Sequence, residues 1–227
     1  MTPRTVEILY QMIAFLFAIS VHESAHAWTA SRCGDPTARM LGRVSLNPIR
    51  HIDLFGTIIL PLVAAISHIP ILGWAKPTPV DPRNFRNPML DDILTSVAGP
   101  VSNFLVATGA LLLLGGISLS SASGHTLIMG LAAGDNGSAS DFAFAPVAVL
   151  LFELMFINIV LAVFNLIPVP PLDGSHVLRH FLPAPARMVY DRIGIFALLA
   201  LVYLGGGLLS GLLRPFVHFY MWMLVKF

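Results

Sequence analysis

The sequence predicts an all-α polytopic membrane protein with about four to six transmembrane helices and a short membrane-associated β segment near the active site. Hydrophobic residues make up 56% of the 227 residues and charged residues only 11%, with a mean hydropathy of +0.80. Average soluble domains are about 25% charged. Apolar stretches long enough to cross a bilayer recur, and the connections between them are short. We therefore expect one intramembrane domain over residues 1–227, regulated if at all by a separate protein.

The first expected span covers about residues 6–30 and contains the motif H-E-S-A-H. Side chains four residues apart lie one turn apart on a helix, so His22 and His26 can bind a single zinc ion. Glu23 is then a candidate general base beside the metal. Ionisable groups inside a membrane segment are costly and indicate a functional site. The alternative is a span with two incidental histidines that are hydrogen-bonded to carbonyls or hydroxyls.

The region from about residue 39 to 88 is expected to hold the β segment and a re-entrant stretch. Arg39 to Pro48 alternates apolar and polar residues, which predicts a short strand. Phe55 to Leu72 is long enough to cross the membrane, but both flanks are basic, so a hairpin that enters and returns is the alternative. The segment from Gly73 to Val80 is predicted to be extended, and such edges can bind an unwound peptide.

Three more spans are expected along the rest of the chain. One covers about residues 91–114 and contains G-P-V-S-N. The next begins near residue 142 and leads into an L-D-G motif that ends at residue 174; prolines at positions 168, 170 and 171 end its helix. A last span is predicted over about residues 193–213, followed by an aromatic interfacial helix to residue 227.

The basic residues predict the orientation of the chain. Ten of the thirteen Lys and Arg residues lie within residues 32–50, 76–86 and 179–192, and residues 115–141 contain none. The positive-inside rule then places the three basic stretches in the cytoplasm. We expect a multi-pass protein of the inner (plasma) membrane with its active site towards the cytoplasmic side. The basic residues form no single face, so nucleic acid is not an expected partner.

A catalytic zinc site usually has three protein ligands, and the orientation suggests Asp173 as the third. The span before it runs from outside to inside, so Asp173 arrives at about the depth of His22 and His26. The alternative is an Asp-Gly turn residue at the membrane boundary. Glu153, in the middle of the same span, either lines a water path or stays protonated and hydrogen-bonded. The remaining histidines are interpreted as packing residues, of which His176 lies nearest to Asp173 in sequence.

Taken together, these motifs resemble the site-2 protease family of M50-type intramembrane zinc metalloproteases. The motifs that carry the resemblance are H-E-S-A-H at residues 22–26, A-G-P-V-S-N at 98–103 and N-L-I-P-V-P-P-L-D-G at 165–174. The connecting segments G-R-V-S-L-N-P at 42–48 and G-W-A-K-P-T-P-V at 73–80 are similar to a minimal bacterial branch without PDZ or CBS domains. The similarity extends over nearly the whole chain.

The resemblance implies a zinc endopeptidase that cuts peptide bonds in or near transmembrane segments of membrane proteins. By the same resemblance, His22, His26 and Asp173 bind one zinc ion per chain, and Glu23 is the catalytic base and acid. Its implied partners are the lipid bilayer and the transmembrane segment of a substrate protein.

The resemblance also assigns a role to Asn165, which would contact the substrate backbone or the developing oxyanion. The alternative is an amide that caps carbonyls freed by Pro168. Gly99 and Asn103 are interpreted as supporting residues that allow close helix packing.

Two other functions fit the same residues. A membrane zinc protease of another type would use a downstream glutamate, such as Glu153, as third ligand and would cut chains outside the membrane. A catalytically silent zinc-binding scaffold would only bind partner helices. The presence of Glu23 argues against the scaffold, because a structural zinc site needs no base.

Overall fold

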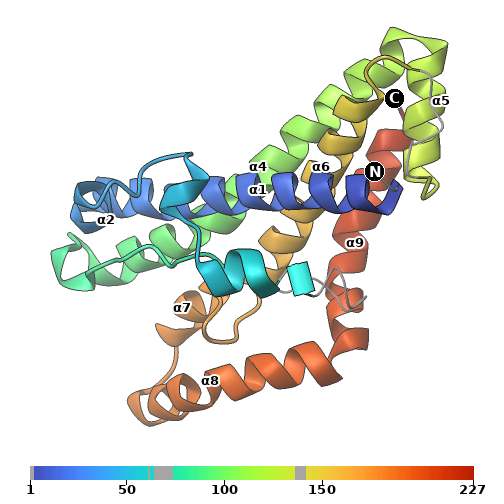
Figure 1. Ribbon diagram of the computed structural model, residues 1–227. Helices are drawn as coiled ribbons and strands as arrows, with labels where there is room; N and C mark the ends of the chain where they lie inside the picture. The colour runs from blue at the N-terminus through green and yellow to red at the C-terminus, as the bar shows by residue number, and fades with distance from the viewer. Residues whose placement is uncertain (1–2, 61, 64–73, 136–141) are drawn as a thin grey trace.

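The computed structural model describes residues 3–60, 62–63, 74–135 and 142–227, and no β-strand occurs in those ranges (Figure 1). The longer helices are α1 (Pro3–Cys33), α4 (Pro88–Ser120), α5 (Ala122–Ala132), α6 (Ala145–Asn165), α8 (Ala184–Leu204) and α9 (Gly206–Val225). The shorter ones are α2 (Thr37–Met40), α7 (Asp173–Arg179), 3-10 turns at Pro48–Arg50 and Pro82–Asn84, and a π-helix at Leu54–Ile59.

Four of the described helices are long and apolar enough to cross a membrane, namely α1 from Thr5, α4, α6 and α9. The outer face of α1 shows why. Leu9, Ile13 and Phe17 follow one another at intervals of four residues, and each exposes more than two fifths of its surface. Ala14 and Ala18 are buried on the opposite face. Large apolar side chains outside and small ones inside suit a helix that lies between lipid and protein.

The bundle is arranged around α4. Helices α4 and α6 lie side by side, and α1 crosses both of them (Figure 1). Helix α9 packs against α5 and α6, while α7 packs against α4. Helix α8 stands at the lower edge of the view and is joined to the bundle mainly through α9. The C-terminal half of α1 therefore meets the first half of α4.

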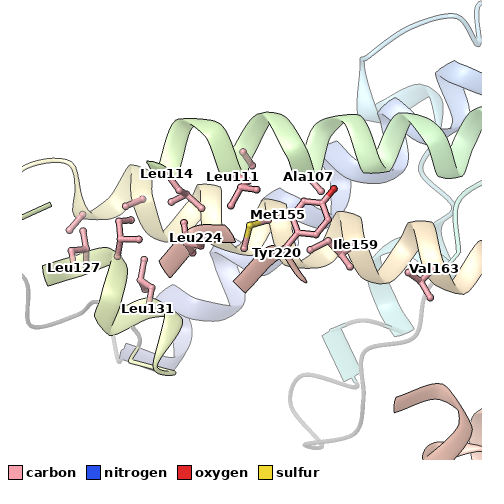
Figure 2. Packing of buried hydrophobic residues seen from close by; sticks show 14 residues of the cluster. Ala107, Leu111, Leu114, Leu127, Leu131, Met155, Ile159, Val163, Tyr220 and Leu224 are labelled. Carbon is pink, nitrogen blue, oxygen red and sulfur yellow. The ribbon is translucent and has the colours of Figure 1, made fainter. Parts of the chain in front are cut away.

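The apolar core lies between the second half of α4 and helices α5, α6 and α9 (Figure 2). Leu114 of α4, Ile128 of α5 and Leu224 of α9 are completely buried there, and Met155 and Ile159 of α6 are almost completely so. The hydroxyl of Tyr220 forms a hydrogen bond with the hydroxyl of Thr108 within this core, at 2.8 Å. This end of the bundle is held by apolar contact.

The predicted short β segment is wrong. In place of a strand over Arg39 to Pro48, the structure has α2, a turn at Gly42 with φ of +70° and a 3-10 turn. The backbone carbonyls of this segment bond to amides within local turns and to side chains instead of to a second strand. The carbonyl of Ser45 accepts hydrogen bonds from the Ser24 hydroxyl and from His51 Nε2, and the carbonyl of Arg50 accepts one from the Arg43 guanidinium.

The alternation of apolar and polar residues in this segment is real but has another cause. Arg43 is buried, whereas Val44 and Leu46 are exposed. The apolar residues therefore point outwards and the basic one points inwards, where carbonyl oxygens receive its hydrogen bonds. Buried polar groups must find such partners, and here they come from neighbouring turns.

The C-terminal span predicted over residues 193–213 is divided in the structure. Helix α8 ends at Leu204 and α9 begins at Gly206, with Gly205 between them. Three successive glycines at 205–207 explain the break, because glycine is a poor helix former. Of these two described helices, α9 is the one both long and apolar enough to cross a membrane, and it includes the aromatic segment that was predicted to be interfacial.

The stretch from Phe55 to Leu72 lies mostly outside the described residues. Its first turn is the π-helix at Leu54–Ile59, which begins after Asp53, whose carboxylate accepts hydrogen bonds from the backbone amides of Phe55 and Gly56. Residues 61 and 64–72 are not described, so the choice between a crossing and a hairpin stays a prediction.

Candidate metal centre

Three ligand atoms meet where α1, α4 and α7 come together. His22 and His26 lie one turn apart on α1 and are both buried, and their Nε2 atoms are 3.0 Å apart. Asp173 is the first residue of α7, and its Oδ2 lies 3.1 Å from Nε2 of His22 and 3.4 Å from Nε2 of His26. These residues form the one group of possible metal ligands found within the described parts of the chain.

The end of α6 directs Asp173 towards the histidines. After α6 the chain turns through the prolines at 168–171, where the Pro170–Pro171 peptide is cis. Gly174 lets α7 begin directly against this turn, because a Cβ at residue 174 would lie 2.8 Å from the Ile167 carbonyl oxygen and still closer to that of Leu166. The Tyr190 hydroxyl of α8 holds the same turn by donating to the Pro168 carbonyl at 2.9 Å.

The two histidines are oriented from α4. Nδ1 of His26 lies 2.7 Å from the backbone carbonyl of Thr95, which can only accept, so this nitrogen carries the proton. Nε2 of His26 is then left with a free lone pair that faces Asp173. Metal-binding histidines usually have their other ring nitrogen fixed by such a hydrogen bond.

A chain of three amide hydrogen bonds orients His22 in the same way. The Leu154 carbonyl accepts from Nδ2 of Asn158 at 2.7 Å, which fixes the amide orientation. Oδ1 of Asn158 then accepts from Nδ2 of Asn103 at 3.1 Å. Oδ1 of Asn103 is left to accept from Nδ1 of His22 at 2.8 Å. Both asparagines are completely buried, so Asn103 does more than allow close packing.

Gly99 makes room for the two imidazoles. A Cβ at this position would lie 2.6 Å from Cε1 of His22 and closer still to Nε2 of His26. No side chain fits there, so the expected supporting role of Gly99 has a steric basis at the ligand atoms themselves.

These residues fit a zinc ion. A tetrahedral zinc with bonds of about 2.0 Å holds its ligand atoms about 3.3 Å apart, close to the observed separations of 3.0 to 3.4 Å. Oδ2 of Asp173 is buried and has no hydrogen-bond partner in the described chain. An unpartnered carboxylate oxygen and two imidazole lone pairs that face it form a donor set suited to a metal cation.

Glu23 is held by a residue that the sequence analysis did not single out. Oε2 of Glu23 accepts hydrogen bonds from the backbone amide of Thr78 at 2.9 Å and from the Thr78 hydroxyl at 2.7 Å. No hydrogen bond from the described residues reaches Oε1. Thr78 belongs to the extended segment between Trp74 and Val80, so this segment fixes the carboxylate beside the histidines.

Comparison with known proteins agrees with this geometry. Residues 10–204 match the family model described as "Peptidase family M50". The chain belongs to peptidase family M50. It is 39% identical over 178 residues to "Putative zinc metalloprotease YwhC" of Bacillus subtilis (strain 168), an alignment that covers 78% of this chain and 71% of that protein.

Two more distant relatives are both called "Putative zinc metalloprotease Rip2". The protein of Mycolicibacterium smegmatis is 29% identical over 76% of this chain, and that of Mycobacterium tuberculosis is 28% identical over 84%. The alignments cover 58% and 64% of these two proteins, less than two thirds of their length. No solved structure matches the chain. The family and the four span-length helices make it a multi-pass membrane peptidase.

Asn165 of this M50 peptidase has a partner within its own helix. The Asn165 side chain donates to the carbonyl of Leu161, one turn earlier in α6, at 3.0 Å. The carbonyl that Pro168 would have satisfied belongs to Phe164, and it accepts instead from the backbone amide of Ile167. The structure therefore shows Asn165 bonded within its own helix, and a contact with substrate stays a prediction.

Glu153 does not join the ligand group. Its carboxylate lies on α6 beside Nε2 of Gln11 on α1, at 3.4 Å. The donor set assembled in the described structure contains Asp173 as its carboxylate. This geometry favours the aspartate over the glutamate as third ligand.

An apolar groove of about 360 Å³ lies beside the H-E-S-A-H motif of the peptidase. Its lining residues are Val21, Ser24, Ala25 and Trp28 of α1 and Val44, Ser45 and Leu46 of the following segment. Ser24 and Ala25 belong to the motif, whereas His22, Glu23 and His26 are not among the lining residues, so the groove lies on another face of α1 from the ligands. Trp28 and Leu46 are each more than half exposed, and the groove is therefore open at the surface.

Proposed function

We propose that this M50 peptidase is a zinc-dependent intramembrane endopeptidase that hydrolyses peptide bonds in or near transmembrane segments of membrane proteins. The observation that carries this proposal is the group formed by the buried His22 and His26 and the partly buried Asp173, with Glu23 adjacent in sequence to His22, at the meeting point of two span-length helices. The relatives described as zinc metalloproteases support the choice of metal and reaction. We expect the site to lie towards the cytoplasmic side of the inner membrane.

One zinc ion per chain is held by Nε2 of His22, Nε2 of His26 and Oδ2 of Asp173. The chemistry that zinc supplies in such a site is polarisation of the scissile carbonyl and a lowered pKa of water. The protein contributes the fixed ligand orientation, since Asn103 and Thr95 hold the two imidazoles before a metal binds.

Glu23 acts as general base and then as general acid. Thr78 engages Oε2 with two donors, which leaves Oε1 available to accept the proton of the attacking water. The same oxygen then passes the proton to the leaving amine. The two hydrogen bonds from Thr78 prevent the carboxylate from rotating away, so the proton is taken and returned at one place.

The substrate is the transmembrane segment of a membrane protein, unwound where it reaches the zinc site. A helical carbonyl is already hydrogen-bonded, so the peptide must be extended before it reacts. The exposed side chains of Val44 and Leu46, facing Trp28, offer apolar contacts of the kind that transmembrane sequences can match. The carbonyls of residues 44–46 belong to an irregular segment and do not form a β ladder.

The test compares Glu23→Gln with Glu153→Gln, two changes from carboxylate to amide within membrane helices. Both proteins are expressed in cells that lack the chromosomal gene, together with a library of tagged single-span proteins from the same cells. Cleavage products are located by mass spectrometry, and zinc is measured on the purified variants. We expect wild type and Glu153→Gln to cut within or next to spans, and Glu23→Gln to bind zinc but not to cut.

Three outcomes would contradict the proposal. Cleavage by Glu23→Gln at the wild-type rate would remove Glu23 from the chemistry. Cleavage sites that all lie far from any span would favour the alternative in which the protease acts on chains outside the membrane. A zinc-loaded wild type that cuts nothing in the library would favour the silent scaffold.

A further inference from the structure

A second group of titratable side chains lies outside the proposed ligand set and joins α7 to α4. Oδ2 of Asp92, near the start of α4, lies 2.7 Å from Nε2 of His180, and Oδ1 lies 3.5 Å from Nδ1 of His176. His176 lies on α7, and His180 is the residue that directly follows the helix with helical backbone angles, so the two side chains, four positions apart, lie on one face. The sequence analysis overlooked this spacing, although it is the same spacing as in the H-E-S-A-H motif. The Asp92 side chain is only 14% exposed.

These three residues do not form a second metal site. In the described parts of the chain, only His22, His26 and Asp173 bring their ligand atoms within 4.8 Å of one another. Asp92, His176 and His180 instead connect two helices. The carboxylate comes from α4, and the two histidines come from α7 and the residue that follows it. Its function is therefore to be sought in the position of α7.

Helix α7 depends on such contacts for its position. It has seven residues, and an isolated helix of this length has little stability in water. Its principal packing partner among the described elements is α4. Asp173 is its first residue, so a displacement of α7 would move the Asp173 carboxylate away from the histidines.

The site-facing side of α4 shows a regular pattern. Asp92, Thr95, Gly99 and Asn103 follow one another at intervals of three or four residues, which places them on one face of the helix. Asn103 orients His22, the Thr95 carbonyl orients His26, and Gly99 gives both rings room. Asp173, the third ligand, is not contacted directly from this face. Its connection to α4 runs through Asp92, which contacts His176 and His180.

We propose that Asp92 is a positioning residue for the third zinc ligand. By holding His180 and His176 it fixes α7, and thereby the Asp173 carboxylate, against His22 and His26. A single face of α4 then positions all three ligands. The proposal rests on the zinc site of the proposed function, but it does not depend on which peptide bond the protein cuts.

The test measures zinc affinity in the detergent-purified full chain by competition with a chromogenic chelator. Asp92→Ala is compared with Asp91→Ala, a matched control in which the neighbouring carboxylate is removed. Asp91 accepts a hydrogen bond from the Asn87 backbone amide, at the start of its own helix. We expect Asp92→Ala to lower zinc affinity about 10- to 100-fold, as is typical for partners of metal ligands, and Asp91→Ala to change it less than about twofold.

A second comparison separates positioning from general support of the fold. In an Asp173→Ala background, zinc can bind only through the two histidines, and the further change Asp92→Ala should then have no effect on the residual affinity. In the wild-type background, His180→Gln keeps a side-chain donor and should retain more affinity than His180→Ala. Thermal unfolding of the zinc-free proteins controls for a loss of folded protein.

Unchanged zinc affinity in Asp92→Ala would overturn the proposal. So would an equal loss of affinity in the Asp173→Ala background, since Asp92 would then act on the whole site. A wild-type protein that binds no zinc would overturn the zinc site and the role of Asp92 together. Cleavage by Glu23→Gln would overturn the proposed mechanism and leave the zinc measurements standing.

Discussion

Helix α4 takes part in two regions that are built differently. Its first half (residues 88–103, the site half) contacts the proposed ligands through Thr95, Gly99 and Asn103. Its second half (residues 104–120, the core half) buries alanines and leucines such as Leu114 against α5, α6 and α9. The site half acts through hydrogen bonds between particular atoms. The core half acts through the volume and area of apolar side chains.

The comparison teaches that metal affinity and fold stability are separable in one helix. A hydrogen bond fails when a single atom moves, whereas apolar packing loses free energy in proportion to the buried surface that is removed. Changes in the site half should therefore reduce metal binding in a protein that still folds. Changes in the core half should reduce stability and leave the metal site of the folded molecules intact.

The largest effect is expected for removal of a ligand. Asp173→Ala and His26→Ala should each purify without stoichiometric zinc and keep only weak residual binding, because two remaining ligands cannot complete a catalytic site. Metal content of the detergent-purified protein, by mass spectrometry, provides the measurement. Glu153→Ala is the control and should keep one zinc per chain. Zinc that survives in Asp173→Ala but is lost in Glu153→Ala would reverse the assignment of the third ligand.

A smaller but still severe effect is expected from one added methyl group. Gly99→Ala places a Cβ against both imidazoles and should lower zinc affinity by at least about 10-fold. Gly109→Ala is the matched control in the core half, where nothing lies within 4 Å of a new Cβ. Chelator competition measures both variants. Equal affinities in the two alanine variants would show that the site can relax around Gly99.

The smallest effect on the metal is expected in the core half. Leu114→Ala removes a completely buried side chain and should lower the free energy of unfolding by about 2–5 kcal/mol. Zinc per folded chain should stay at the wild-type value. Denaturant unfolding in detergent measures the loss of stability. Metal analysis of the folded fraction measures zinc per folded chain. A parallel loss of zinc affinity would mean that the two halves of α4 are coupled.

The proposed ligands could be predicted from the sequence because each carries a signal that does not depend on distant contacts. His22 and His26 have helical spacing, and Asp173 was a candidate from the predicted orientation of its span and from the family motif that contains it. Thr95 could not be found, because its contribution is a backbone carbonyl that any residue would supply. Asn158 was missed, although a buried amide in an apolar span is itself a signal.

The prediction of the β segment failed because an alternating pattern does not reveal which groups satisfy the backbone. Over residues 39–48 the Ser45 carbonyl bonds to the side chains of Ser24 and His51, and the carbonyls of Arg39 and Arg43 accept from backbone amides within local turns. The break at Gly205 could have been predicted, since three successive glycines favour the end of a helix. The predicted span over residues 193–213 followed the hydropathy of the segment and disregarded the low helix propensity of these glycines.

The contact between Thr78 and Glu23 also determines the register of the extended segment. Pro77 and Pro79 flank Thr78, and proline has no backbone N–H. Over these three residues Thr78 therefore carries the single amide hydrogen, and Glu23 accepts it. A shift of the segment by one residue in either direction would present a proline nitrogen to the carboxylate and lose the bond. Because of the two prolines, the alignment of the segment along α1 that places Thr78 at Glu23 forms this hydrogen bond, and the alignments shifted by one residue do not.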